Sequence, residues 1–144
     1  MGLFSKFLGT QPQKKASDDV LLLHSMMLMA CADGVLEGAE AATLEAFVNT
    51  LPEFREGDFE EQWAQAKKLA GRFKDIKESV RALGEIQSES VRKKAFILAV
   101  DIALASGDID EREEELLEAM ARVMNIDEEL AHKVIEVLSL KYVR

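Results

Sequence analysis

The stretch MACADGVLEGAE (residues 29–40) has a similar counterpart, IALASGDIDERE (residues 102–113), at an offset of 73 residues. At this offset residues 20–54 can be laid over residues 93–127. The matched pairs are Met29 with Ile102, Ala30 with Ala103, Ala32 with Ala105, Gly34 with Gly107, Leu36 with Ile109, Glu40 with Glu113 and Leu44 with Leu117. Self-similarity at a fixed offset is typical of a repeated structural unit. We therefore expect two copies of one helical hairpin.

Each copy of the repeat has the pattern of an apolar helix, a glycine turn and an acidic helix. A glycine just past the end of a helix supplies the left-handed backbone that closes the helix at little cost. Acidic side chains at the start of the next helix interact favourably with the positive end of its dipole. Two such hairpins can pack together and bury both apolar helices, and we expect the segment between them to cover or link them.

Capping residues and amphipathic spacing predict seven helices in total. They are expected from Ser17 or Asp18 to about Ala32, from Glu37 to about Leu51, from Asp58, from Asp75, from Ser88 or Ser90 to about Ala105, from Asp110, and from Asp127 to about Lys141. Three capping boxes are predicted, namely Asp58 with Glu61, Asp75 with Glu78, and Asp110 with Glu113. No segment alternates for long enough to predict a strand. The expected fold is all-α, a compact bundle of about seven helices with an internal pseudo-repeat of helical hairpins.

The chain of 144 residues suits a single domain, which we place at residues 16–144. We expect residues 1–15 to be a separate leader and linker. Apolar side chains of the leader, at Leu3, Phe4, Phe7 and Leu8, fall at helical spacing. The leader is therefore either a short amphipathic helix or a frayed segment packed loosely on the domain.

The formal net charge is −9, and the negative charge is concentrated at the two repeats. The formal net charge is −7 over residues 37–61 and −9 over residues 101–129, whereas it is +5 over residues 62–100. Binding to phosphate backbones takes clustered Lys and Arg, so we expect no nucleic-acid partner. An acidic surface suits a cation or a basic protein instead.

Cysteine content and hydropathy predict a cytoplasmic protein that does not span a membrane. Cys31 is the only cysteine, which excludes an internal disulfide and fits a reducing compartment. No apolar run reaches the roughly 18 to 20 residues that a membrane span needs.

No metalloprotease motif, phosphate-binding glycine loop or nucleophile elbow is present, so we expect no enzyme activity. His24 lies on a mostly apolar helix and is expected to be a core or boundary residue rather than a ligand. Asp101 interrupts the apolar run FILAVDIALA (residues 96–105). It lies either on the exposed stripe of its helix or in the core, where it needs a Lys, an Arg or a proton.

The two glycine turns are candidate metal sites, although neither is a calcium EF-hand loop. With Gly34 at the invariant glycine position of that loop, Met29 and Cys31 take the first and third positions, where carboxylates are required. A different carboxylate site remains open, because six acids flank the two turns, namely Asp33, Glu37, Glu40, Asp108, Asp110 and Glu113. If the turns face each other, these acids suit a hard divalent ion, Ca²⁺, Mg²⁺ or Mn²⁺. The alternative is that they only cap helices and favour helix dipoles.

The two repeat stretches, residues 29–40 and 102–113, resemble the signature of the TerB family of bacterial tellurite-resistance proteins. That signature is the end of an apolar helix, Ala-Asp-Gly, an apolar residue and then Glu. The segments LPEF (residues 51–54) and MNID (residues 124–127) and the opening MGLFSKF (residues 1–7) are also similar to members of the family. The resemblance covers nearly the whole chain.

The resemblance implies a bundle of about seven helices, acidic metal ligands and a role in tellurite resistance and stress response. It also implies a membrane partner of the TerC type, or other tellurite-resistance proteins, and a location in the cytoplasm or at the periphery of the inner membrane. One departure is that Ser106 stands where the second copy should have Asp. This weighs against two equal sites, although Asp108 can substitute, and it makes Asp33 and Glu40 the better-supported ligands. The rival expectation is a metal-free adaptor that docks a basic or membrane-associated protein.

Overall fold

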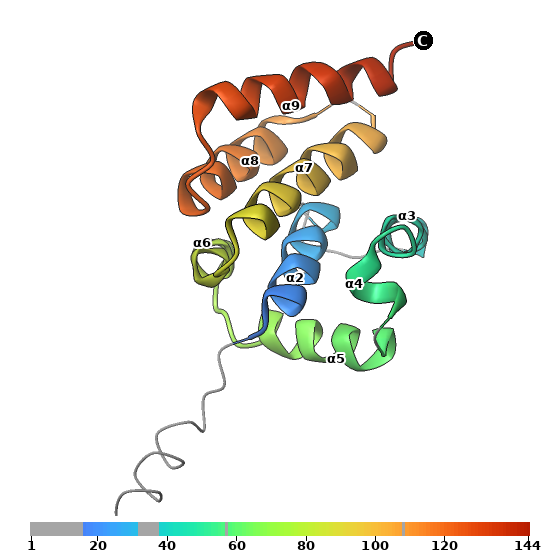
Figure 1. Cartoon of the computed structure of the whole chain (residues 1–144), viewed down its shortest axis with the longest axis vertical. Coiled ribbons are helices and arrows are strands. Elements are labelled where there is room, and N and C mark those ends of the chain that lie inside the picture. Colours follow the sequence, from blue (N-terminus) through green and yellow to red (C-terminus); the bar gives the residue numbers. More distant parts are fainter. Residues whose placement is uncertain (1–15, 32–37, 57, 108) are drawn as a thin grey trace, which may run out of the picture.

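The computed structural model describes residues 16–31, 38–56, 58–107 and 109–144. These residues contain helices and no strand, which confirms the all-α fold (Figure 1). The helices are α2 (Asp18–Ala30), α3 (Gly38–Val48), α4 (Pro52–Arg55), α5 (Phe59–Ala70), α6 (Ile76–Arg81), the 3-10 helix η1 (Ala82–Glu85), α7 (Glu89–Ala105), α8 (Glu111–Val123) and α9 (Glu128–Lys141).

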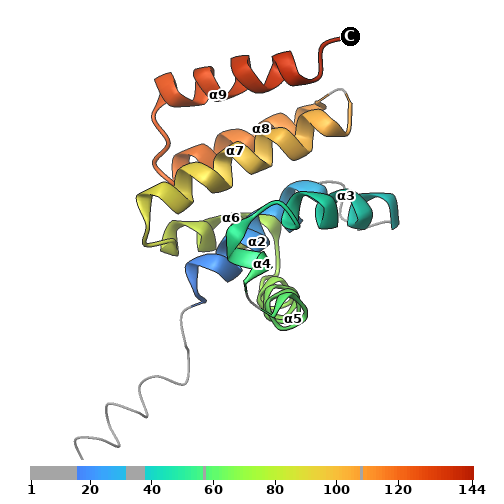
Figure 2. The same ribbon diagram turned by 45° about the vertical axis from the view of Figure 1, so that its right-hand side comes forward.

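Helix α2 lies at the centre of the N-terminal half and packs against α3, α5, α6, η1 and α7. Nine of its thirteen residues are buried. A helix that is apolar around most of its circumference must be covered on most sides, which explains why so many neighbours surround α2. Figures 1 and 2 show α2 between α7 on one side and α4 and α5 on the other.

Helix α7 is the second buried helix and joins the two halves of the molecule. It packs against α2 on one side and against α8 and α9 on the other. Figure 2 shows the resulting order, with α9 outermost, α7 and α8 below it, and α2 with its neighbours beneath. The core methionines are all buried, as expected of flexible apolar side chains, at Met26, Met27, Met29, Met120 and Met124.

The predicted repeat is visible in the helices. Helices α3 and α8 begin at Gly38 and Glu111, which are equivalent at the offset of 73. The matched residues Leu44 and Leu117 are both buried. In Figures 1 and 2, α2 and α7 run in roughly the same direction, so their C-terminal ends point toward the same end of the molecule.

The predicted N-caps are confirmed for six helices. In each case the side chain accepts a backbone N–H of the first turn, and the caps are Ser17, Asp58, Asp75, Ser88, Asp110 and Asp127. Of the three predicted capping boxes, only Asp110 with Glu113 is reciprocal, whereas Asp58 and Asp75 act as simple N-caps. The carboxylate of Glu78 accepts from the backbone N–H of Lys74 at 3.1 Å, one residue before the cap.

Helix α4 was not expected, because the predicted helices leave a gap between the end of one at about Leu51 and the start of the next at Asp58. Proline lacks an N–H and has a fixed φ, which suits the first residue of a helix. Pro52 accordingly starts the short helix α4, and Phe54 in that helix is buried. The eight α-helices of the described residues therefore exceed the predicted number by one. No helix of the described residues is long and apolar enough to cross a membrane.

Candidate functional site

The second glycine turn follows the end of α7, where Gly107 adopts a backbone conformation with positive φ. Gly107 has a φ of +111°, a conformation that residues with a Cβ rarely adopt. Its N–H donates to the carbonyl of Leu104 at 3.2 Å. The hydroxyl of Ser106 donates to the carbonyl of Ala103 at 2.8 Å. The residue that departs from the repeat pattern thus satisfies a carbonyl at the helix end.

Two of the six predicted site residues, Asp110 and Glu113, hold each other at the start of α8. The backbone N–H of Glu113 donates to Oδ1 of Asp110 at 2.9 Å, and the N–H of Asp110 donates to Oε2 of Glu113 at 3.2 Å. The capping role of this pair is confirmed. A carboxylate has two oxygens with about four lone-pair directions, so capping by one oxygen leaves the other oxygen of Asp110 able to accept.

The other predicted site residues lie wholly or partly outside the described part of the chain. Asp33, Glu37 and Asp108 lie outside it. Glu40 belongs to α3, and only its backbone is described. Among the described residues, no three His, Cys, Asp or Glu side chains gather closely enough to hold a metal ion. Convergence of all six acids on one ion therefore stays a prediction.

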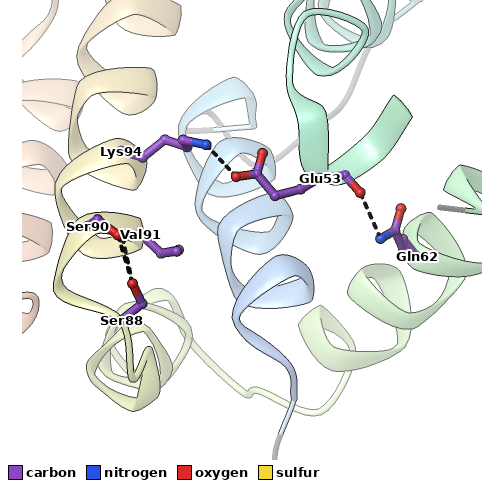
Figure 3. Close-up of polar contacts among 6 residues, drawn as sticks. All are labelled: Glu53, Gln62, Ser88, Ser90, Val91 and Lys94. Carbon is purple, nitrogen blue, oxygen red and sulfur yellow. Dashed lines mark hydrogen bonds and ion pairs between the residues drawn. The ribbon is translucent and has the colours of Figure 1, made fainter. Parts of the chain in front are cut away.

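A polar cluster between α4 and α7 was not predicted from the sequence. Lys94 on α7 forms an ion pair with Oε1 of Glu53 on α4, and the side chain of Glu53 is only 17% exposed (Figure 3). Gln62 on α5 donates to the backbone carbonyl of Glu53 at 3.4 Å. Figure 3 shows Lys94 and Gln62 on opposite sides of Glu53, so this residue connects three helices.

Charges in this cluster shift two pKa values in opposite directions. Burial opposes ionisation of Glu53, but the hydrogen bonds from Lys94 and the backbone outweigh it and lower the pKa of Glu53 below 4.5. Burial raises the pKa of Asp19 above 3.8, and the nearby charges of Glu53 and Asp18 add to that effect. The charge of Lys94 lowers the pKa of both carboxyls, but at Asp19 burial and the neighbouring acids outweigh it.

Asp18 connects the starts of two helices. Its carboxylate accepts the backbone N–H of Gln87 at 2.9 Å and that of Ser88 at 3.0 Å. Ser88 in turn caps α7, and its hydroxyl lies 2.9 Å from that of Ser90 (Figure 3). The hydrogen bonds of Asp18 hold the N-terminal ends of α2 and α7 together.

Asp101 is buried and partnered, which decides between the two alternatives that its sequence context left open. Its side chain is 12% exposed and accepts hydrogen bonds from Lys141 and from the hydroxyl of Tyr142. The hydrogen bond to Asp101 raises the pKa of Lys141 above 10.5. Burial, together with Asp101, raises the pKa of Tyr142 above 10.0. Lys141 also lies 5.5 Å from the ring centroid of Phe47 on α3.

His24 is a core residue, as expected. It is fully buried, and its Nε2 lies 3.0 Å from the carbonyl oxygen of Ser79. Because a carbonyl can only accept, Nε2 carries the proton and Nδ1 is the unprotonated nitrogen. Burial lowers the pKa of His24 below 6.5, although the bond to Ser79 opposes the shift. Sequence separation hid three of these contacts, because Ser79 lies 55 residues from His24, Lys141 lies 40 residues from Asp101, and Lys94 lies 41 residues from Glu53.

The family model described as Tellurite resistance protein TerB matches residues 19–134 of the chain. This range contains both repeats, both glycine turns and the capping box of α8. No curated protein and no solved structure matches the chain. TerB is a helical domain, in agreement with the helices described above. Because the match spans most of its length, the chain belongs to the TerB family of tellurite resistance proteins.

Proposed function

We propose that this protein is a non-enzymatic component of tellurite resistance and stress response that binds a divalent cation through its acidic turns. The observation that carries the proposal is the shared direction of α2 and α7, which pack against each other (Figures 1 and 2). Each helix leads into a glycine turn of the repeat, and the C-terminal ends of α2 and α7 lie at the same end of the bundle. Carboxylates from both repeats can then serve one ion.

The donor chemistry of the turns fits a hard cation. All six acids offer oxygen, which is what Ca²⁺, Mg²⁺ and Mn²⁺ prefer. The cap at α8 uses Oδ1 of Asp110 and so is compatible with a metal on the other oxygen. Ser106 is already bonded to a carbonyl, so it is a poor substitute for the missing Asp. We assign the stronger ligands to the first turn, at Asp33 and Glu40.

Isothermal titration calorimetry with CaCl₂, MgCl₂ and MnCl₂ tests this proposal. We expect heat from at least one ion and its loss in Asp33→Asn with Glu40→Gln. These changes remove charge and keep side-chain size. The matched control is Glu60→Gln with Glu136→Gln, which removes the same charge from exposed positions on α5 and α9. No heat with any ion, or equal losses in both double variants, would contradict the proposal.

A metal-free adaptor is the second candidate, and exposed apolar side chains on α9 and just after it favour this candidate. Val137, Leu140 and Val143 near the C-terminus are 64%, 71% and 68% exposed. Large apolar side chains exposed together are typical of protein contacts. The partner expected from the family is a membrane protein of the TerC type, reached from the cytoplasm at the inner membrane.

Co-sedimentation with vesicles that contain a TerC-type protein distinguishes the adaptor from the cation binder. The adaptor model predicts binding in the presence of a chelator and its loss in Val137→Glu with Leu140→Glu. Binding that requires the cation would support the first candidate instead. Equal sedimentation with vesicles that lack the TerC-type protein would contradict the adaptor.

A further inference from the structure

An open groove of about 650 Å³ runs between α6 and α8. Its floor is apolar and includes Val80, Leu116 and Ala119. Ile76 at one edge is 49% exposed, which is high for a large apolar side chain. The groove therefore offers apolar surface that no described residue of this chain covers.

The rim of the groove is cationic, although the whole chain has a net charge of −9. Lys77 and Arg81 lie one helical turn apart on α6, and Arg112 and Arg122 line the groove on α8. All four are exposed, and none forms an ion pair with a described residue. Four unpaired cations around an apolar floor are an arrangement that an anionic, partly apolar ligand would complement.

The two sides of the groove differ in charge. On α6 both charged lining residues are cations, whereas α8 also contributes Glu115 and Glu118 between its two arginines. Phosphate backbones would meet these two carboxylates in the groove, which disfavours a nucleic acid. A ligand with acids along one flank and an apolar stripe beside them matches the groove better, because its acids can face Lys77 and Arg81.

We propose that the groove between α6 and α8 binds an acidic amphipathic helix of a partner protein. Between Arg112 and Arg122, α8 extends for about 15 Å at the usual rise per residue, which is about three turns of a docked helix. Apolar side chains of such a helix repeat every three or four residues and would fill the floor. Glutamates flanking that stripe would pair with Lys77 and Arg81, which have no ion-pair partner among the described residues.

Fluorescence anisotropy with a panel of labelled synthetic helices tests the proposal on the full chain. Each helix carries leucines at i, i+3, i+4 and i+7 and glutamates on its flanks, and its control carries lysine at every glutamate position. We expect glutamate helices to bind, lysine helices to fail, and affinity to fall as salt is added. If no glutamate helix binds, or if both series bind alike, the proposal is overturned.

Charge reversal locates the binding site. Lys77→Glu with Arg81→Glu should weaken binding of the glutamate helix by about tenfold or more, because two attractions become repulsions. The matched control is Lys67→Glu with Lys68→Glu, which makes the same charge change at exposed positions on α5. Circular dichroism checks that both double variants remain helical. Equal weakening in both would overturn the proposal, because it would show a general charge effect.

A second variant tests the apolar floor independently of charge. Ala119→Trp should block the groove and reduce helix binding, because Ala119 is only half-buried and lines the floor. The same series tests two rival occupants of the groove, an anionic membrane surface and a second copy of this chain. If the glutamate helices do not bind, sedimentation of the chain with phosphatidylserine vesicles would overturn the partner-helix assignment in favour of the membrane. Self-association that Ala119→Trp abolishes would overturn it in favour of the second copy.

Discussion

The ammonium group of Lys141 donates hydrogen bonds to both carboxylate oxygens of Asp101, at 3.2 Å to Oδ1 and 3.0 Å to Oδ2. This contact fastens the end of α9 to the buried helix α7. Tyr142 donates to the same carboxylate. A carboxylate in the core is tolerated only when such partners replace its water.

Lys141→Met should lower the free energy of unfolding by about 1–3 kcal/mol, because it leaves Asp101 with only the Tyr142 hydroxyl in a largely buried position. Urea unfolding followed by circular dichroism measures the loss. The control is Lys133→Met, which removes an exposed pair with Glu129 on the same helix. That control should cost only a few tenths of a kcal/mol. Equal costs for the two variants would show that the Asp101 contact adds no stability.

Stability should decline as the pH falls below 6.5, and His24 should cause part of the decline. Burial lowers its folded-state pKa, so the unfolded chain binds a proton first as the pH falls. The contribution of His24 is complete above pH 6.5 and is lost as the pH falls through that value toward the folded-state pKa. Urea unfolding between about pH 7 and pH 5 measures this slope, above the range in which most carboxyls titrate.

His24→Gln should flatten the slope, because Gln cannot be protonated and its amide can still donate to Ser79. The control is His132→Gln at an exposed position on α9, which should leave the slope unchanged. An unaltered slope in His24→Gln would mean that other groups cause the pH dependence.

Asp110→Ala should lower the free energy of unfolding by about 1 kcal/mol, since it removes the N-cap of α8. Asn caps helices as well as Asp does, so Asp110→Asn should leave stability nearly unchanged. It still removes one negative charge from the second turn. If Asp110 also ligates a cation, Asp110→Asn weakens cation binding in calorimetry at unchanged stability, whereas a pure cap gives unchanged binding.

Gly107→Ala should destabilise the chain by about 1–2 kcal/mol through backbone strain alone. A Cβ at Gly107 meets nothing within 4 Å, so the cost comes from the φ of +111° and not from a clash. Gly71 ends α5 with a φ of −69°, which any residue adopts. Gly71→Ala should therefore be neutral or slightly stabilising. Thermal unfolding of the two variants compares them, and similar melting temperatures would refute strain at Gly107.

The sequence predicted the features that depend on neighbouring residues. N-caps such as Ser17 and Asp127 lie within three residues of the N–H groups that they accept, so their positions follow from local chemistry. The repeat offset likewise placed the starts of α3 and α8 at equivalent positions. The short helix α4 was not predicted, because a proline such as Pro52 can follow the end of one helix as well as start the next.

Contacts between distant residues could not be predicted, because they depend on packing. Glu53 and Lys94 are 41 residues apart, and only the arrangement of α4 beside α7 brings them together. The charge of the α6–α8 groove was hidden in the same way, since its cations come from two separate segments. For the candidate metal site, the sequence identified Asp110 and Glu113 at one turn, and the structure established their capping role.

If the two acidic turns share one divalent cation, as we propose, paramagnetic broadening by Mn²⁺ should reach both turns at once. In an ¹H–¹⁵N correlation spectrum of the labelled protein, substoichiometric Mn²⁺ should broaden the amide signals of Gly34 and Gly107 together, before those of other residues. Excess Ca²⁺ or Mg²⁺ should restore them. Broadening confined to exposed acids elsewhere, such as Glu128 and Glu136 on α9, or no selective broadening, would contradict the proposal.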